Sequence, residues 1–72
     1  MHISYKKLFH MLIDRDVSPS ELQKDAGFSR NILTRLRRNE FISLESIASI
    51  CRVLNCGVDE ILEFQFDEEV SE

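Results

Sequence analysis

Proline, glycine and cysteine are scarce in this 72-residue sequence, which has one proline, two glycines and two cysteines. Cys51 and Cys56 lie five positions apart, with no second cysteine pair and no histidine nearby, so their spacing indicates neither a zinc site nor a disulfide scaffold. No apolar run approaches the roughly eighteen residues that span a bilayer, and the N-terminus lacks the pattern of a secretory signal peptide. We therefore expect one small, cytoplasmic domain with no metal, no other cofactor and no membrane partner.

Residues suited to catalysis are also few. His2 and His10 are the only histidines, and neither has a serine, cysteine or carboxylate at catalytic spacing. Glycine-rich phosphate loops are absent from the sequence, and so small a core has no room for a pocket that excludes water. The sequence thus predicts a binding protein without a small-molecule substrate, and not an enzyme.

The net charge of −4 is unevenly distributed along the chain. Residues 1–58 contain all nine basic residues and six acidic ones, whereas residues 59–72 contain seven acidic residues and no basic one. The average therefore hides a basic body and an acidic tail. We expect a folded domain over residues 1–64 and a disordered acidic tail over residues 65–72.

The rest of the sequence has apolar residues spaced three and four apart, which is typical of short helices. Five segments open with a residue suited to the N-cap, flanked by apolar residues at the spacing of a hydrophobic staple; these caps are Ser4, Ser18, Ser29, Ser43 and Gly57. The sequence predicts an all-α fold with five helices, over residues 5–15, 19–26, 30–38, 44–54 and 58–63. Two apolar stripes are predicted to form the core: Tyr5, Leu8, Phe9 and Leu12 in the first helix, and Leu44, Ile47, Ala48, Cys51 and Leu54 in the fourth.

A very short connection joins the second and third predicted helices. Residues 18–21, Ser-Pro-Ser-Glu, form a capping box with proline at the first helical position, which fixes the start of the second helix. Gly27 suits the left-handed conformation that ends a helix, and Ser29 caps the next helix two residues later. So tight a turn makes the helices cross steeply, and the sequence therefore predicts a helix-turn-helix.

The third predicted helix has a polar face and an apolar face. A sector of about 140° around the helix axis contains Arg30, Asn31, Thr34, Arg35 and Arg38. Arg37 lies on the flank of this sector, and the opposite side of the helix contains Ile32, Leu33 and Leu36. Arginine and asparagine bind guanine and adenine through paired hydrogen bonds, and threonine bonds a base or touches a thymine methyl group. No acidic residue occurs over residues 26–39, so phosphates would be attracted. The pattern favours a DNA-reading helix over a solvated face, which normally mixes charges of both signs.

These features resemble the lambda-repressor-like, Cro-type (XRE family) helix-turn-helix domains over about residues 4–64. The matching segments are residues 18–22, 26–29, 31–36 and 47–62. The resemblance implies a compact five-helix domain that binds double-stranded DNA as a homodimer and acts as a repressor or other regulator of transcription. It also implies contacts to phosphates and base edges from Ser29, Arg30, Asn31, Thr34 and Arg35, and a contact to the DNA backbone from Arg38.

Three features depart from the family pattern. Pro19 stands where family members often hold a phosphate, but it has neither a side-chain donor nor an N–H, so Ser18 or Ser20 would have to substitute. Gln23 stands where a small residue is usual at the helix crossing, so its side chain must turn outward or widen the crossing. Uncharged residues are common at the positions of Arg30 and Arg35, so the bases that this chain reads cannot be inferred from those that a relative reads.

Two interpretations of function remain open. In the first, the chain is a transcription regulator of bacterial or phage type, whose dimer places two reading helices about one turn of B-form DNA apart. In the second, the same fold binds another regulator, through the acidic tail or through apolar surface left exposed by Phe41, Val53, Phe64 and Phe66. Phe41 and Phe64 can equally pack at the edge of the core or build the homodimer.

Overall fold

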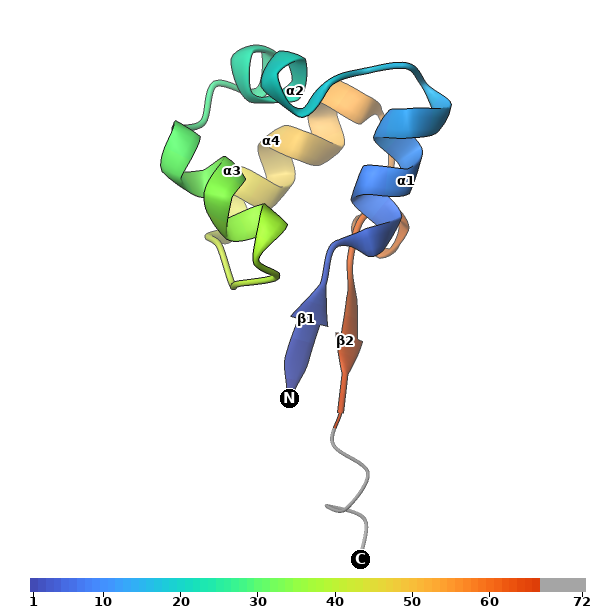
Figure 1. Cartoon of the computed structure of the whole chain (residues 1–72), viewed down its shortest axis with the longest axis vertical. Helices are drawn as coiled ribbons and strands as arrows, with labels where there is room; N and C mark the ends of the chain where they lie inside the picture. The colour runs from blue at the N-terminus through green and yellow to red at the C-terminus, as the bar shows by residue number, and fades with distance from the viewer. Residues whose placement is uncertain (67–72) are drawn as a thin grey trace, which may run out of the picture.

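In the computed structural model, which describes residues 1–66, four helices surround one core and a small two-stranded sheet projects from them (Figure 1). The helices are α1 (Lys6–Asp14), α2 (Pro19–Ala26), α3 (Arg30–Arg37) and α4 (Leu44–Leu54). The 3-10 turn η1 (Val58–Glu60) follows α4. The strands β1 (His2–Ser4) and β2 (Glu63–Gln65) pair antiparallel, with Ile3 opposite Phe64. No helix within residues 1–66 is long and apolar enough to cross a membrane.

The first four predicted helices are confirmed to within one residue at each end, but the prediction of an all-α, five-helix fold is wrong. Residues 58–63 were expected to form a helix, and they form η1 followed by the start of β2. A segment this short gains too few hydrogen bonds to offset the cost of nucleating an α-helix. Ser4 lies in β1 and is not the N-cap of α1, which is Tyr5, although its hydroxyl accepts a hydrogen bond from the Lys6 N–H at 3.3 Å.

The acidic end of the chain is only partly described. The domain boundary predicted at residue 64 falls inside β2, and the segment over residues 67–72 lies outside the described residues. The expectation of a disordered tail therefore stays a prediction.

Local sequence signals fix both ends of α2 and the start of α4. The Ser18 hydroxyl accepts a hydrogen bond from the Glu21 N–H at 3.1 Å, and the Ser18 N–H donates to the Glu21 carboxylate at 2.9 Å. Ser43 caps α4 in the same way by accepting from the Ser46 N–H at 3.1 Å. Gly27 ends α2 with φ of 78°, and an added Cβ would meet no atom within 4 Å. The left-handed backbone, and not a lack of space, therefore favours glycine there.

The buried core contains side chains from all four helices, from β1 and from the residues after η1. The stripe predicted for α1 is confirmed at Tyr5, Leu8 and Leu12, whereas Phe9 is half-buried. The stripe predicted for α4 is rotated: Ile47, Ile50 and Leu54 are buried, while Leu44 is 83% exposed and Ala48 is also exposed. The spacing of α4 allows two neighbouring apolar stripes, and packing against α2 selects the one that contains Ile50.

Tyr5 joins the end of α3 to the start of α1. Its hydroxyl donates to the Glu40 carbonyl at 2.7 Å, and its N–H donates to the Asn39 side-chain oxygen at 2.9 Å. Asn39 has φ of 57°, the left-handed conformation that stops α3. Burial raises the pKa of the Tyr5 hydroxyl, and a hydrogen bond with the Ile42 backbone partly lowers it. These bonds hold the C-terminal end of α3 in place relative to the core.

Candidate nucleic-acid interface

The helix α3 lies at the edge of the domain, with one face on the core and the other on the surface (Figure 1). Leu33 and Leu36 are buried and Ile32 is half-buried, which confirms the predicted apolar face. Leu22 and Ala26 are the buried residues of α2, the helix that precedes the turn. The helix-turn-helix is therefore anchored by apolar contacts from both of its helices.

All six predicted site residues are exposed, and all of them lie within residues 29–38. Arg30, Asn31, Thr34 and Arg35 lie in α3, while Ser29 is its N-cap and Arg38 its C-cap. Within residues 1–66, no ion pair with a carboxylate involves Arg30 or Arg35. The face is thus basic, and within residues 1–66 no carboxylate pairs with Arg30 or Arg35, which favours binding to phosphates.

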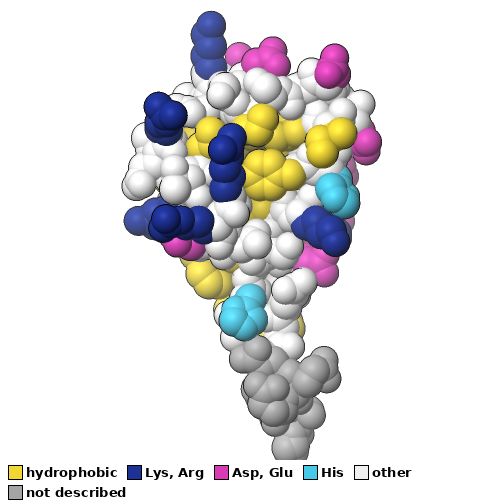
Figure 2. Space-filling model, in the orientation of Figure 1, with side chains coloured by type: hydrophobic (Ala, Val, Ile, Leu, Met, Phe, Trp, Pro, Cys, Tyr) yellow, Lys and Arg dark blue, Asp and Glu magenta, His cyan; other side chains and the backbone are white. Residues whose placement is uncertain are grey.

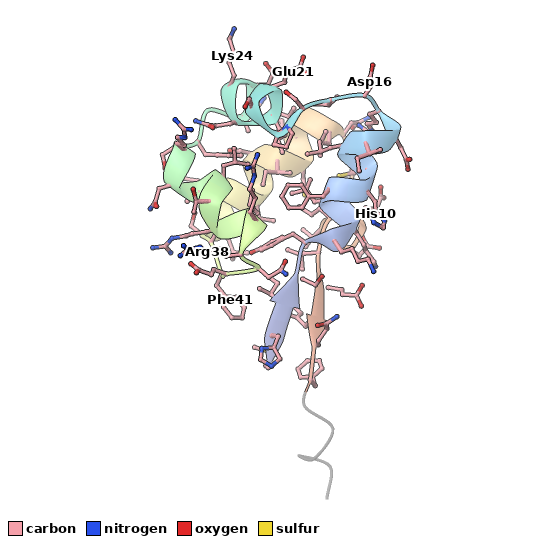
Figure 3. The ribbon with its side chains drawn as sticks, viewed as in Figure 1. His10, Asp16, Glu21, Lys24, Arg38 and Phe41 are labelled. Carbon is pink, nitrogen blue, oxygen red and sulfur yellow. The ribbon has the colours of Figure 1, made fainter. Side chains whose placement is uncertain are left out.

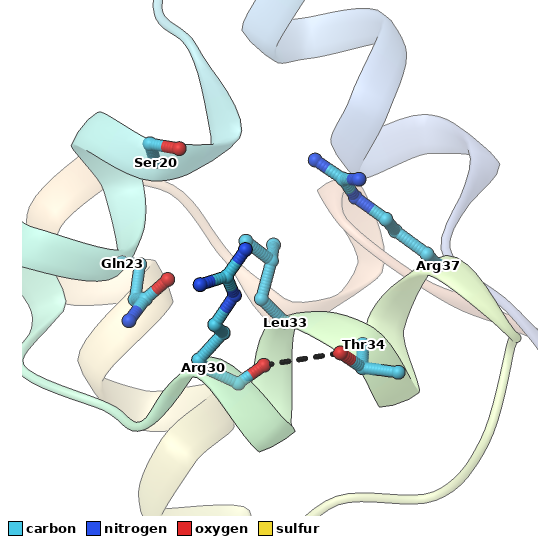
Figure 4. A pocket seen from close by; sticks show the side chains of 6 residues that line it. All are labelled: Ser20, Gln23, Arg30, Leu33, Thr34 and Arg37. Carbon is cyan, nitrogen blue, oxygen red and sulfur yellow. Dashed lines mark hydrogen bonds between the residues drawn. The ribbon is translucent and has the colours of Figure 1, made fainter.

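Arg30 and Thr34 belong to a hollow between α2 and α3, which we call the α2–α3 hollow (Figure 4). Its lining residues are Ser20, Gln23, Arg30, Leu33, Thr34 and Arg37. Sequence reasoning placed Arg37 on the flank of the helix and left it out of the site. Arg37 lies about 20° from Arg30 around the helix, and this small angle could have indicated that the two side chains share one surface. The angle alone does not show that α2 borders this side.

Two residues named as departures from the family pattern or as substitutes for one, Gln23 and Ser20, lie on the α2 side of this hollow. Gln23 is half-buried and its side chain lies beside the hollow, on the same side as Arg30 (Figure 4). Ser20 also lines the hollow, whereas the Ser18 hydroxyl is engaged in the capping box of α2. Of the two serines that flank Pro19, Ser20 is therefore the one placed beside the arginines.

Thr34 uses its hydroxyl proton within its own helix. The hydroxyl donates to the Arg30 carbonyl at 3.3 Å, as the dashed line in Figure 4 marks. Threonine often bonds the preceding turn of a helix in this way. In this conformation the methyl group and the oxygen lone pairs of Thr34 remain available to a ligand.

Ser29 lies in a different hollow from Arg30. Although it occupies the N-cap, its side chain makes no capping hydrogen bond within the described chain. The hollow that it lines is completed by residues of the turn and by α4 residues that include Glu45 and Ser46. The structure therefore does not bring Ser29 and Arg30 together in one pocket, and it places an acidic side chain beside Ser29.

Among the predicted site arginines, only Arg38 pairs with a carboxylate within residues 1–66. Its guanidinium lies 3.9 Å from the Glu40 carboxylate, and the two side chains are 71% and 48% exposed. An exposed ion pair of this length contributes little to stability and is readily exchanged for a phosphate contact.

Cations in the last turn of a helix interact favourably with its dipole. This interaction gives Arg35 and Arg37 a structural benefit that is independent of any ligand.

The charges of the surface are separated on the face that Figure 2 shows. Most of its lysine and arginine side chains lie toward α2 and α3, while acidic side chains are more frequent along the opposite edge. Figure 3 places Lys24 and Arg38 on the side of α2 and α3, and Asp16 and His10 on the far side. This polarity would orient a polyanion toward α3.

Two helices joined by a short turn, with buried apolar residues in both and an exposed basic face on the second, are typical of the helix-turn-helix class of DNA-binding domains. The family model described as the Cro/C1-type HTH DNA-binding domain matches residues 7–67. The chain belongs to this family, which confirms the resemblance seen in the sequence.

One similar solved structure is that of the transcriptional regulator VanUg, in its second crystal form. The two chains are 38% identical with a TM-score of 0.88, and the match covers 92% of this chain and 88% of that one. No match was found among curated proteins.

Proposed function

We propose that this DNA-binding domain is a sequence-specific transcription regulator that acts as a homodimer and reads the major groove with α3. The observation that carries the proposal is the exposed basic face of α3 on a helix whose opposite face is buried. The similarity to a transcriptional regulator supports the same conclusion. The proposed activity is binding, without catalysis.

The residues divide into two groups by their place on α3. We assign Asn31 and Arg35, which lie outside both hollows, to base edges, because their paired donors and acceptors match adenine and guanine. Ser29 and Arg38, at the two ends of the helix, are assigned to phosphates. Arg30 and Thr34, which line the α2–α3 hollow, complete the proposed reading face.

Selection of bound duplexes from a random pool tests this function. A palindromic site with half-sites about one helical turn apart is expected, because it requires recognition and two-fold symmetry together. Recovery of no preferred sequence would contradict sequence-specific reading.

On a selected site, Arg35→Ala is expected to cost about 1 to 3 kcal/mol of binding free energy, and more on the cognate than on a random duplex. Arg52→Ala is the matched control, since Arg52 is an exposed arginine of α4 away from the helix-turn-helix. An equal loss in the two variants would remove Arg35 from the reading set.

A second surface supports the homodimer. Phe41, Leu44, Val58 and Phe64 are 51%, 83%, 48% and 49% exposed, and they surround a groove whose floor contains Ile47 and Leu62. We call these four residues the apolar face; Figure 3 shows Phe41 pointing away from the helices. Exposed apolar surface of this kind marks protein contacts. Phe66, the residue after β2, is 69% exposed as well.

The size of the apolar face predicts a weak dimer. The four side chains together expose on the order of 400 Å², about half of what each partner buries in a stable interface. Two copies are therefore expected to associate mainly on DNA, where neighbouring half-sites raise their effective concentration.

Sedimentation and binding titrations with one and two half-sites test this arrangement. Cooperative binding to two half-sites, lost in Leu44→Glu, would support the homodimer. Independent binding of the two copies by the unaltered chain would contradict it and assign the apolar face to another protein.

A further inference from the structure

The two cysteines meet where α4 ends. Cys51 lies in the penultimate turn of α4, and Cys56 follows Asn55, whose left-handed backbone (φ 53°, ψ 55°) stops the helix. The N–H groups of Asn55 and Cys56 both donate to the Cys51 carbonyl, the second at 3.1 Å. In this type of helix ending the chain folds back, and the residues at the positions of Cys51 and Cys56 commonly touch.

The hydrogen bond limits the separation of the two Cα atoms. With standard bond lengths, an N–H to O=C contact of 3.1 Å between these residues keeps their Cα atoms within about 7 Å of each other. Disulfides form with Cα separations up to about that value. The Cα separation set by this helix ending is therefore compatible with a disulfide between the two cysteines.

Both thiols can also be reached from solvent. Cys51 and Cys56 are half-buried free thiols, and they line one surface groove together with Ala48 and Arg52. Burial is the largest cause that raises the pKa of Cys56, and the charge of the neighbouring Cys51 thiol and of Glu60 raises it further. Within residues 1–66 no group of three metal-binding side chains is present to claim these thiols for an ion.

We propose that Cys51 and Cys56 are a reversible redox site that forms an intramolecular disulfide by exchange with a low-molecular-weight disulfide such as glutathione disulfide. The Cys51 thiolate attacks one sulfur of the small disulfide, forms a mixed disulfide and expels one small thiolate. The Cys56 thiol then loses its proton and attacks the Cys51 sulfur, which expels the second small thiolate. The protein loses two electrons and two protons, and the small disulfide becomes two thiols.

Burial and neighbouring negative charge raise the pKa of Cys56, and because the thiolate is the attacking species, this slows any attack by Cys56 at neutral pH. No residue that lines this groove lies in α3, although Leu44 and Val58 of the apolar face line it as well. Oxidation is therefore expected to leave binding to random DNA at low salt unchanged.

The test is titration of the purified chain with defined ratios of glutathione disulfide to glutathione, followed by alkylation and intact-mass analysis. The expected product lacks two hydrogen atoms, resists alkylation at both cysteines, remains monomeric on a non-reducing gel and reverts with a dithiol reductant. Cys56→Ser should instead stop at the glutathione adduct on Cys51, because no second thiol can displace it. A stable adduct on the unaltered chain, or a disulfide only between chains, would overturn the proposal.

A second measurement separates preorganisation by the fold from ordinary closure of a short loop. The equilibrium constant for oxidation should be at least about tenfold larger in native buffer than in concentrated urea, and oxidation should raise Tm correspondingly. Equal constants in the two conditions, or a lower Tm after oxidation, would show that the native fold does not favour the pair and would overturn the proposal as well.

Discussion

Arg37 gives the sharpest test of the α2–α3 hollow, because it lies there with Arg30 and was not evident as a site residue from the sequence. Within residues 1–66 it forms no ion pair with a carboxylate. Arg37→Gln keeps most of the side-chain length and removes one positive charge. If Arg37 contacts a phosphate, the substitution should weaken binding to every DNA sequence by a similar factor.

The size of the effect follows from counterion release. Each phosphate neutralised by the protein adds about 0.9 to the slope of log affinity against log salt, so losing one contact should make the slope shallower by about 0.9. If counterion release is the whole contribution of Arg37, the loss of DNA affinity in Arg37→Gln vanishes near 1 M salt. The loss then amounts to about 15-fold at 50 mM salt and about fourfold at 200 mM.

Fluorescence anisotropy with a labelled random duplex, measured between 50 and 200 mM salt, checks this prediction. Arg52→Gln serves as the control because it makes the same charge change on α4, at an exposed position outside the helix-turn-helix. Screening over about 10 Å at 0.1 M salt should make its effect small. A salt slope unchanged by Arg37→Gln, or shifted as much by Arg52→Gln, would refute a phosphate contact at the hollow.

Three substitutions and one truncation test the fold and the tail. Tyr5→Phe removes the hydrogen bond to the Glu40 carbonyl and should lower the free energy of unfolding by about 1 to 2 kcal/mol in urea titrations. Because burial raises the Tyr5 pKa, the Tyr5 hydroxyl ionises at a lower pH in the unfolded chain than in the folded one. The contribution of the neutral hydroxyl to stability is therefore complete below about pH 10 and is lost as the pH rises through the folded-state pKa. Tyr5→Phe should not show that loss. Leu36→Ala, at a fully buried position, should cost about 2 to 5 kcal/mol, whereas Leu44→Ala, 83% exposed, should change monomer stability by less than about 0.5 kcal/mol. Truncation after Phe66 keeps β2 and removes four acidic residues, and it should strengthen binding to random DNA at low salt; equal affinity would leave the tail without this role.

Local signals were sufficient for most of the helical framework. The capping box at Ser18 and the left-handed turn at Gly27 depend on neighbours within four residues, so the sequence reveals them directly. The two faces of α3 are equally local, since they follow from the angle between successive helical residues. The predicted boundaries of α2 are accordingly those of the structure.

Long-range contacts account for what the sequence did not predict. Ile3 pairs with Phe64 across almost the whole described chain, and no pattern within either three-residue segment specifies that partner. In α4 both Leu44 and Ile50 belong to apolar stripes, and only the position of α2 decides which residue is buried. These errors concern how elements meet, and not whether they form.

The same distinction applies to the interface. The exposed face of α3 is a property of one helix, and for that reason the sequence identified its arginines, Asn31 and Thr34. The α2–α3 hollow is a property of two helices, so Arg37, Gln23 and Ser20 became visible only when α2 was placed against α3. The residues proposed to read bases were thus predictable from the sequence. Arg37, Gln23 and Ser20, which border the hollow together with Arg30 and Thr34, required the tertiary structure.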